Sequence, residues 1–149
     1  MARGRVFTPT VAAAQSWATR FHTFAYRASG GRVGGRLLGC PVLLLITKGR
    51  RSGRETTTPL LYLVDGGNIV VVASNGGAAS HPDWWLNLTA NPEADVEISR
   101  KKMQVRAEEV EGAEKHRLWK RLVEMYPSYA AYQSKTDREI PVIVLHPAG

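Results

Sequence analysis

The sequence predicts a mainly β fold of the α+β class, in which six antiparallel strands form a small barrel and short helices plug its sides. Three observations support this prediction. Apolar, β-prone runs recur along the chain, tight-turn signals separate neighbouring runs, and the stretches with helical periodicity are short. A length of 149 residues with 44% hydrophobic side chains fits one globular domain with its own core.

The first half of the predicted barrel consists of three consecutive strands. They cover residues 42–47, 56–64 and 69–74. Gly49 and Gly53 mark the connection between the first two strands, and Asp65-Gly66-Gly67-Asn68 is a tight-turn signal between the second and the third. Connections this short join antiparallel neighbours.

The second half adds three strands and the helices. The strands cover residues 94–98, 103–110 and 140–145, the first two joined through residues 99–102. A short helix is predicted to begin after Ser80 as N-cap, with Pro82 in its first turn, and to end at Asn91. Two more helices are predicted over residues 111–126 and 127–134, separated by a proline.

Residues 1–35 are predicted to form an arm, an amphipathic helix and a glycine-rich linker in front of the barrel domain, residues 36–149. Trp17, Phe21 and Phe24 recur at helical spacings in this segment, beside arginines. The aromatic stripe either packs on the domain or lies on an anionic membrane or over an apolar substrate.

The net charge of +7 is distributed unevenly. Residues 1–54 carry ten Lys or Arg side chains and no Asp or Glu, whereas residues 55–149 carry ten cations and thirteen acids. This asymmetry indicates an anionic partner, such as a phosphorylated ligand, a membrane surface or nucleic acid. Nucleic acid is the weakest of the three, because no recognised binding module accompanies the cations.

The densest group of cations lies in the loop between the first two strands. Lys48, Arg50, Arg51 and Arg54 fall within seven residues and repel one another, so a bound anion would relieve an electrostatic cost. Arginine offers paired donors to phosphate oxygens, and the two glycines of the loop let the backbone come close. A solvated basic turn is the simpler explanation of the loop on its own.

Other kinds of site find little support. The four histidines are scattered, with no second His or Cys at a zinc spacing, so no metal site is predicted. Neither a G-x-S-x-G motif nor a Walker phosphate loop is present. Cys40 is the only cysteine and fits a packed thiol in a reducing cytoplasm. No apolar run has the length of a transmembrane helix or of a signal-peptide core, so we expect a cytoplasmic protein.

Three tyrosines follow one another around a proline near the end of the chain. Tyr126, Tyr129 and Tyr132 are spaced by three, which places the last two on one helix face and the first on the neighbouring turn. Such phenols either belong to the core or line a pocket for a planar carbonyl compound.

Three stretches of the sequence, in this order, resemble the deazaflavin (F420)-dependent nitroreductase family, which includes F420H2-dependent quinone reductases. They read ITKGRRSGRETTTPLLYLVDG, VVASNGGAASHPDWWLNLTANP and MYPSYAAYQSKTDREIPVIVL, and the resemblance covers residues 36–146. Members of this family use reduced coenzyme F420, and many reduce quinones in actinobacteria. The resemblance implies a split β-barrel, the fold of flavin-binding oxidases.

The resemblance also implies a coenzyme site. The coenzyme's phosphate and acidic tail would be held by Lys48, Arg50, Arg51, Ser52, Gly53 and Arg54. Its rings would lie along Thr58, Pro59 and Leu60. The rings and their linker would also contact Ala73, Ser74, Asn75, Gly76 and Gly77. The pocket would be braced by Trp84 and Asn87. Substrate would face Ser74 and three tyrosines, Tyr126, Tyr129 and Tyr132, as the candidate catalytic residues.

The reaction implied is hydride transfer from reduced F420 to a menaquinone-like quinone or to a nitro-aromatic acceptor. Two alternatives remain open: an FMN-binding split-barrel oxidoreductase, and a non-catalytic carrier of a deazaflavin or a lipid. If the acceptor is a membrane quinone, the aromatic N-terminal helix would bring this cytoplasmic protein to the inner face of the cell membrane.

Overall fold

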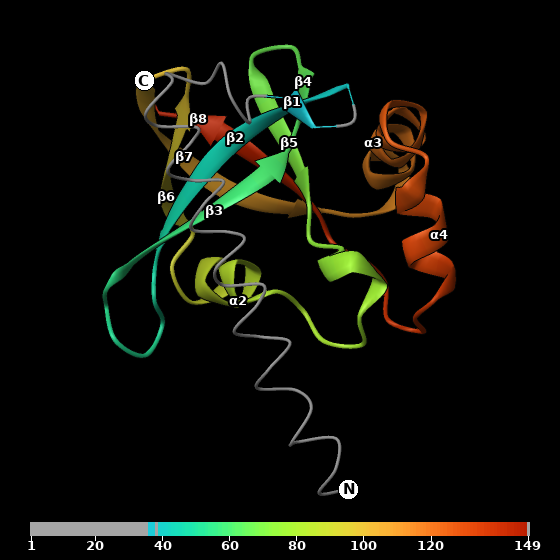
Figure 1. Cartoon of the computed structure of the whole chain (residues 1–149), viewed down its shortest axis with the longest axis horizontal. Helices are drawn as coiled ribbons and strands as arrows, with labels where there is room; N and C mark the ends of the chain where they lie inside the picture. Colours follow the sequence, from blue (N-terminus) through green and yellow to red (C-terminus); the bar gives the residue numbers. More distant parts are fainter. Residues whose placement is uncertain (1–35, 38, 149) are drawn as a thin grey trace, which may run out of the picture.

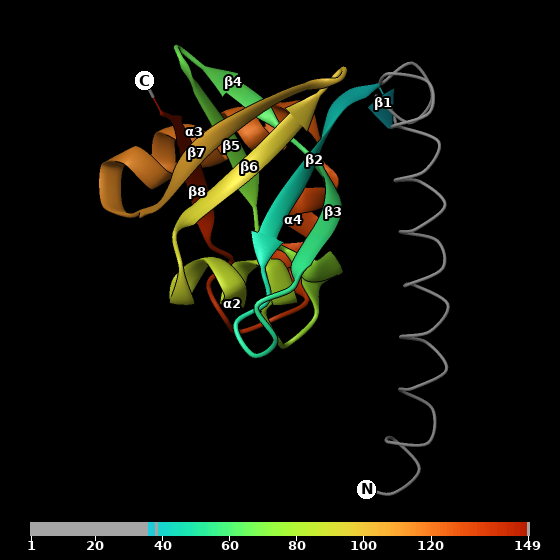
Figure 2. The ribbon, with the colours of Figure 1, turned by 90° about the vertical axis from the view of Figure 1, so that its left-hand side faces the viewer.

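The computed structural model describes residues 36–37 and 39–148. The arm and helix predicted for residues 1–35 lie outside the described residues, so they stay a prediction. The described residues form one curled, antiparallel sheet with short helices around it (Figures 1 and 2). Its eight strands are β1 (Arg36–Leu37), β2 (Cys40–Lys48), β3 (Glu55–Leu61), β4 (Leu63–Asp65), β5 (Asn68–Val72), β6 (Glu93–Ile98), β7 (Lys101–Val110) and β8 (Val142–Pro147). The helical elements are η1 (Asn75–Gly77), α2 (Asp83–Ala90), α3 (Gly112–Met125) and α4 (Ser128–Ser134).

The sheet curls into a barrel because one continuous stretch of chain, β3 followed by β4, pairs with strands at opposite sides of the sheet. The strand order is β1-β2-β6-β7-β8-β5-β4, and β3 pairs with β2 as well. β3 and β4 are separated only by Tyr62, so the same stretch pairs first with β2 and then with β5. β3 also lies close to β5, but the described residues form no ladder between them. The barrel is therefore split between β3 and β5.

The mainly β fold is as predicted, but the count of six strands is wrong for the described residues. The predicted strand over 56–64 is divided at Tyr62, because Leu61 pairs with Val42 whereas Leu63 pairs with Val70 on a different strand. The chain bends between these two partners. β1, a two-residue strand on β2, accounts for the remaining difference.

The predicted connection over residues 99–102 is also shorter than expected. β6 ends at Ile98 and β7 begins at Lys101, so only Ser99 and Arg100 form the turn. Both have positive φ angles, 49° and 71°, as the central residues of a two-residue hairpin turn often do.

β5 and β8 are buried on both faces, which explains their uninterrupted apolar sequences. Along β5, Ile69 and Val71 point into the barrel, while Val70 and Val72 point outward to α3 and α4. The inner core is completed by Trp84, Trp85 and Leu88 of α2, which closes one end of the barrel. Two hydrophobic layers therefore hold the sheet, one inside the barrel and one beneath the C-terminal helices.

The start of α2 differs from the prediction. Ser80 is not its N-cap; the helix begins at Asp83, and Pro82 before it has an extended backbone, with ψ of 152°. The carbonyl of Ser80 instead accepts a hydrogen bond from the side-chain amide of Asn75, at 3.1 Å. Ser80 is thus part of the turn that follows β5.

Candidate functional site

Most of the predicted site residues come together at one end of the barrel. The loop between β2 and β3, the turn after β5 with η1, and helix α2 lie at this end, and α4 lies beside η1 (Figures 1 and 2). The fold thus brings together segments that are far apart in the sequence.

The backbone closes the basic loop, residues 48–54, into a fixed shape. The amide of Gly49 donates to the carbonyl of Arg54 at 2.7 Å, and the amide of Gly53 donates to the carbonyl of Gly49 at 2.8 Å. Gly53 has a φ of 73°, a conformation that a side chain would strain. The hydroxyl of Ser52 accepts the amide of Arg54 at 3.1 Å. Ser52 therefore supports the loop from within.

Asn87 anchors this loop to α2. Its side-chain oxygen accepts hydrogen bonds from the amide and the guanidinium of Arg50, at 3.1 and 3.0 Å, and its amide donates to Thr47 at 3.2 Å. Asn87 is only 3% exposed, so leaving these groups unpaired would be costly. Asp83 adds an exposed ion pair with Arg50 at 3.4 Å. Arg50 is therefore fixed by protein groups.

The other three cations of the loop are free to bind an anion. Lys48, Arg51 and Arg54 are exposed, and none of their side chains has an ion-pair or hydrogen-bond partner among the described residues. The positive charge on this loop is consequently unbalanced. Such a group attracts phosphate or carboxylate oxygens.

The turn after β5 follows an unusual backbone path. Asn75, Gly76 and Gly77 all have positive φ angles, of 48°, 64° and 82°. Ala73 before them is fully buried, and Ser74 is only 9% exposed. The hydroxyl of Ser74 has no hydrogen-bond partner among the described residues. Because buried hydroxyls are rarely left unpaired, this one is suited to meet a bound ligand.

Gly77 packs this turn directly against α4. A Cβ atom at this position would lie 2.8 Å from the carbonyl oxygen and 3.0 Å from the Cα atom of Tyr132. Only glycine allows that approach. The turn with Ser74 and the helix with Tyr132 are therefore in contact.

The three predicted tyrosines form one aromatic cluster with two different environments. The hydroxyls of Tyr126 and Tyr132 share a hydrogen bond of 3.0 Å, and both side chains are half-buried. This bond and burial raise the pKa of Tyr132. Tyr129 packs edge-on against Tyr126, with centroids 4.9 Å apart, and is 5% exposed in the outer core. Tyr129 therefore supports the other two rings from behind.

Burial raises the pKa of Tyr129 above its ordinary value, and the nearby Cys40 thiol and the other two tyrosines add to the effect. The Cys40 thiol is itself buried and donates to the carbonyl of Met125 at 3.4 Å. Tyr129 and Tyr132 thus stay protonated at neutral pH, and the hydrogen-bonded pair of Tyr126 and Tyr132 can offer one hydroxyl hydrogen outward.

The remaining predicted residues lie along β3 and inside the barrel. Thr58, Pro59 and Leu60 are half-buried on β3, whose single ladder among the described residues is the one with β2. Pro59 has no N–H to offer on the unpaired edge, as is typical of edge strands. Trp84 is 5% exposed in the inner core, where it supports the closed end of the barrel.

Arg138 is a site residue that the sequence did not reveal. It lies between α4 and β8, and its guanidinium donates to the carbonyl of Ser74 at 2.8 Å and to that of Ala78 at 2.9 Å. Burial lowers the pKa of this guanidinium, which nevertheless stays a cation at neutral pH. The only local signal is an arginine just before an apolar strand, which is too common to single it out.

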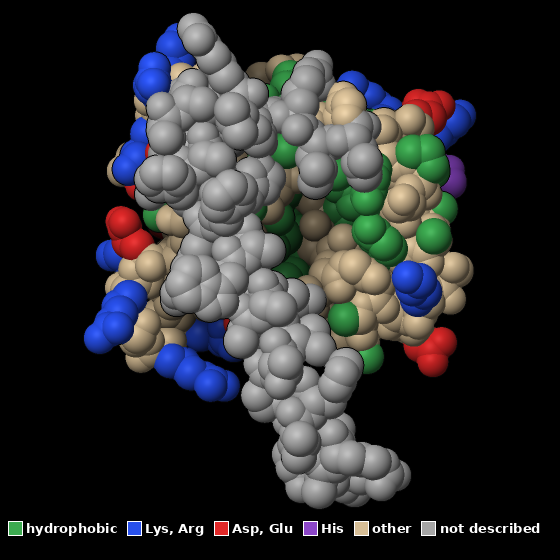
Figure 3. All heavy atoms as spheres, viewed as in Figure 1, with side chains coloured by type: hydrophobic (Ala, Val, Ile, Leu, Met, Phe, Trp, Pro, Cys, Tyr) green, Lys and Arg blue, Asp and Glu red, His purple; other side chains and the backbone are tan. Residues whose placement is uncertain are grey.

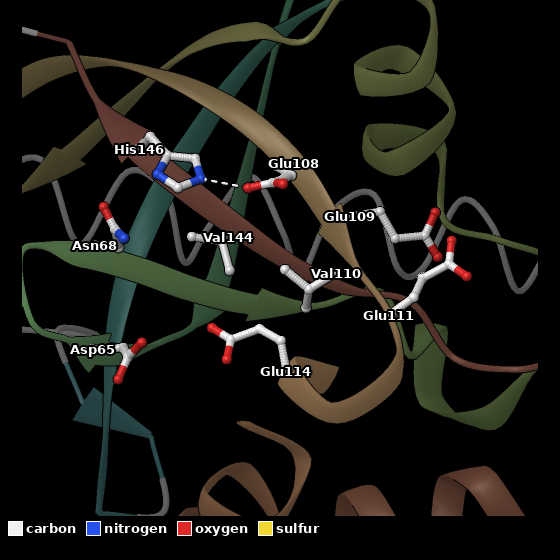
Figure 4. A pocket seen from close by; sticks show the side chains of 9 residues that line it. All are labelled: Asp65, Asn68, Glu108, Glu109, Val110, Glu111, Glu114, Val144 and His146. Carbon is white, nitrogen blue, oxygen red and sulfur yellow. Dashed lines mark hydrogen bonds and ion pairs between the residues drawn. The ribbon is translucent and has the colours of Figure 1, made fainter. Parts of the chain in front are cut away.

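A hollow marks this region on the molecular surface. Figure 3 shows it on the side of η1 and α4, with hydrophobic side chains beside it. A separate cavity of about 540 Å³ runs along β5 and β8, from Asp65 and Asn68 to Val110 and Glu111 (Figure 4). It is lined by Asp65, Asn68, Glu108, Glu109, Val110, Glu111, Glu114, Val144 and His146. Its carboxylates would repel an anionic ligand, so the charge favours the basic end as the site.

Two further kinds of site can be addressed within the described part of the chain. It contains no group of three or more His, Cys, Asp or Glu side chains that could hold a metal ion. None of its helices is long and apolar enough to cross a membrane.

Taken together, the fold and this site define a split-barrel protein with a cationic loop that is suited to an anionic ligand. Known proteins narrow the class. The chain matches the model of the family described as F420H(2)-dependent quinone reductase over residues 17–147. An F420H(2)-dependent quinone reductase of Mycobacterium tuberculosis is 40% identical over 130 residues, which cover 85% of this chain and 87% of that protein.

Two solved structures are similar to this chain in both sequence and fold. An F420-H2 dependent reductase is 42% identical, with a TM-score of 0.66, over 71% of this chain and 94% of that one. A protein solved as a domain-swapped dimer is 38% identical, with a TM-score of 0.68, over 89% of this chain and 99% of that one. The chain belongs to the F420H(2)-dependent quinone reductase family.

Proposed function

We propose that this protein binds reduced coenzyme F420 and uses it to reduce a quinone to the hydroquinone. The observation that carries the proposal is that two features occur together at one end of the barrel: a cationic loop, and a buried Ser74 hydroxyl with no hydrogen-bond partner among the described residues. The loop suits the acidic end of such a coenzyme, and the hydroxyl suits its polar ring system. When bound, reduced F420 supplies a hydride.

Different residues of the chain would bind the acidic end of the coenzyme and its ring system. Lys48, Arg51 and Arg54 would hold the phosphate and carboxylates, while Arg50 and Asn87 keep the loop in place. Thr58, Pro59 and Leu60 would line one side of the ring, and the turn from Ala73 to Gly77 the other. Because the split barrel closes around apolar side chains, water would be kept from the ring face.

Tyr126 and Tyr132 are the best candidates to meet the acceptor. A quinone that gains a hydride develops negative charge on its oxygen and needs a proton. The outward hydroxyl of the Tyr126–Tyr132 pair could donate a hydrogen bond there, strengthened by the bond that the pair shares. Ser74 offers a second hydroxyl on the neighbouring turn. This assignment is a hypothesis for these three side chains.

We also propose a menaquinone-like acceptor at the inner face of the cell membrane, with nitro-aromatic compounds as adventitious substrates. The support is in the sequence of residues 1–35, where Trp17 and Phe21 recur beside Arg20 and Arg27. Such a segment suits an anionic lipid surface. Deleting residues 1–30 should lower turnover of a long-chain quinone in anionic vesicles far more than turnover of a water-soluble quinone. Equal losses on both would contradict membrane contact.

One assay tests the central proposal. Purified protein is mixed with reduced F420, and oxidation of the coenzyme is followed by its visible absorbance with and without a water-soluble quinone. Quinone-dependent oxidation with stoichiometric hydroquinone supports the proposal. Binding without oxidation would indicate the carrier, and tight binding of FMN in place of F420 would indicate a flavin enzyme.

A further inference from the structure

The guanidinium of Arg138 lies at the centre of a hydrogen-bond network around the turn of residues 73–78. Its Nε donates to the carbonyl of Ala78 at 2.9 Å. One terminal nitrogen donates to the carbonyls of Ser74 at 2.8 Å and Ala73 at 3.3 Å. One rigid, planar group therefore holds both ends of the turn.

The other terminal nitrogen of Arg138 lies 3.1 Å from Nδ1 of His81. An arginine has hydrogen-bond donors and no acceptor, so Nδ1 of His81 must accept. His81 belongs to the segment that leads from the turn into α2, so this bond extends the network towards the closed end of the barrel.

Arg138 is itself held in place by α4. The side-chain amide of Gln133 donates to the carbonyl of Arg138 at 2.8 Å, and its oxygen accepts the amide of Ile140 at 3.0 Å. Gly77 of the turn is in contact with Tyr132 on the same helix. The turn and the tyrosine helix are thus fixed relative to each other through both Arg138 and Gly77.

The partners of Arg138 argue against a direct role in anion binding. Four of the hydrogen bonds that its five N–H groups can make are directed at Ala73, Ser74, Ala78 and His81. By contrast, Arg51 is exposed and its side chain has no partner among the described residues. The two arginines should therefore act in different ways.

We infer that Arg138 is a positioning residue, which sets the 73–78 turn so that Ser74, Asn75 and Gly76 meet the coenzyme while Tyr132 stays beside them. The inference rests on the proposed function for the identity of the ligand. Its structural half, the ordering of the turn by Arg138, concerns the coenzyme-free protein and can be tested alone.

The first experiment measures amide hydrogen exchange in the coenzyme-free protein. Arg138→Met should speed exchange of the Gly77 and Ala78 amides, which donate to Ser74 and Asn75, by about tenfold or more, because the turn opens locally. The amide of Ala107, which donates to the carbonyl of Pro92 in the sheet, should keep its wild-type rate. Unchanged exchange at Gly77 and Ala78 would overturn the inference, whether or not the protein binds F420.

The second experiment measures the Kd of oxidised F420 by fluorescence at low and high salt. Arg138→Met should weaken binding about tenfold at both salt concentrations, because the lost contribution is the order of the turn. For Arg51→Gln the loss should shrink at high salt, because an exposed charge is screened. A loss for Arg138→Met that disappears with salt would show a direct charge contact and refute positioning.

Two variants control for folding and for charge. Arg138→Lys keeps the charge but loses the planar fork, so it should recover part of the affinity and of the exchange protection. It also replaces Arg138→Met if that variant does not fold. Arg106→Met removes an exposed cation on β7 and should change neither measurement. If wild-type protein itself fails to bind F420, the proposed function falls, while the exchange result still decides the ordering of the turn.

Discussion

Tyr129 differs from the other two tyrosines of the cluster because its ring lies in the outer core, where it is 5% exposed. Burial raises the pKa of this phenol, so the folded protein keeps the proton at a pH where the unfolded chain, with an ordinary pKa near 10, has released it. The unfolded state then binds fewer protons, and the stability contributed by the neutral phenol is lost as pH rises above about 10.

Tyr129→Phe should therefore make the free energy of unfolding fall less steeply with pH at alkaline pH. At pH 8 its free energy of unfolding should stay within about 1 kcal/mol of wild type, because only a buried hydroxyl is removed. Above pH 10 the variant should lose less stability than wild type. Urea unfolding at pH 8 and at pH 10.5 measures both values. Parallel losses in the two proteins would mean that Tyr129 does not titrate with unfolding.

The Tyr126–Tyr132 pair leads to a prediction about turnover. Removing either hydroxyl, by Tyr126→Phe or Tyr132→Phe, breaks their 3.0 Å hydrogen bond and the orientation it gives to the remaining O–H. We expect about a tenfold fall in kcat with the quinone and little change in the Kd of F420. The double variant should be only slightly worse than either single one, because the two hydroxyls act as one unit. Full turnover in both single variants would remove the pair from the reaction.

At the scale of elements, the contact between η1 and α4 depends on a single missing side chain. Gly76 and Gly77 both have positive φ, but a Cβ at Gly76 would have no neighbour within 4 Å, whereas one at Gly77 would meet the backbone of Tyr132 at 2.8 Å. Gly76→Ala carries the cost of the backbone conformation alone, about 1 kcal/mol. Gly77→Ala adds a clash between two elements.

We accordingly expect Gly77→Ala to lower the free energy of unfolding by about 3 kcal/mol, well beyond Gly76→Ala. Since α4 must move to make room, Gly77→Ala should also reduce quinone turnover more than Gly76→Ala does. Urea unfolding and steady-state kinetics of the two variants provide the comparison. Equal stability losses would indicate that α4 is not held against the turn in solution.

The elements themselves were largely predictable, since their signals are local. Alternating or continuous apolar runs indicated the strands, and Asp65 to Asn68 indicated the β4–β5 hairpin that the structure contains. The bend at Tyr62 was not predictable, because it depends on which strand each half of the run pairs with. The position of Ser80 was not predictable either. Its carbonyl accepts a hydrogen bond from the side chain of Asn75, and this contact competes with a role as N-cap.

Long-range contacts limited the prediction of the candidate site even more than that of the elements. Cations and glycines in the basic loop were visible as a cluster because they are neighbours in sequence. Arg138 was not, because the groups it holds lie 57 to 65 residues earlier in the chain. Asn87 likewise acquires its role only when α2 packs against the loop that carries Arg50. Roles set by folding across long separations leave no pattern in one sequence.

At the scale of the whole molecule, positive and negative side chains gather in different places. The cations of the basic loop lie at the end of the barrel that α2 closes, whereas the carboxylates of the acidic cavity come from β7, the β4–β5 hairpin and the start of α3 (Figure 4). Among the described residues, the ion pairs of the cavity's carboxylates involve none of the loop cations, so removing those carboxylates should leave the loop unchanged.

Two matched double variants test this separation. Arg51→Gln with Arg54→Gln removes two positive charges near the proposed coenzyme site, and Glu109→Gln with Glu111→Gln removes two exposed negative charges lining the acidic cavity. At about 0.1 M salt, where the Debye length is about 10 Å, the arginine variant should bind F420 at least about tenfold more weakly. The glutamate variant should bind it within about twofold of wild type, because neither glutamate side chain forms an ion pair or hydrogen bond with the basic loop among the described residues. Fluorescence titration gives both affinities. If the glutamate variant bound F420 as much more tightly as the arginine variant bound it more weakly, net charge and not the loop would govern recognition of the coenzyme.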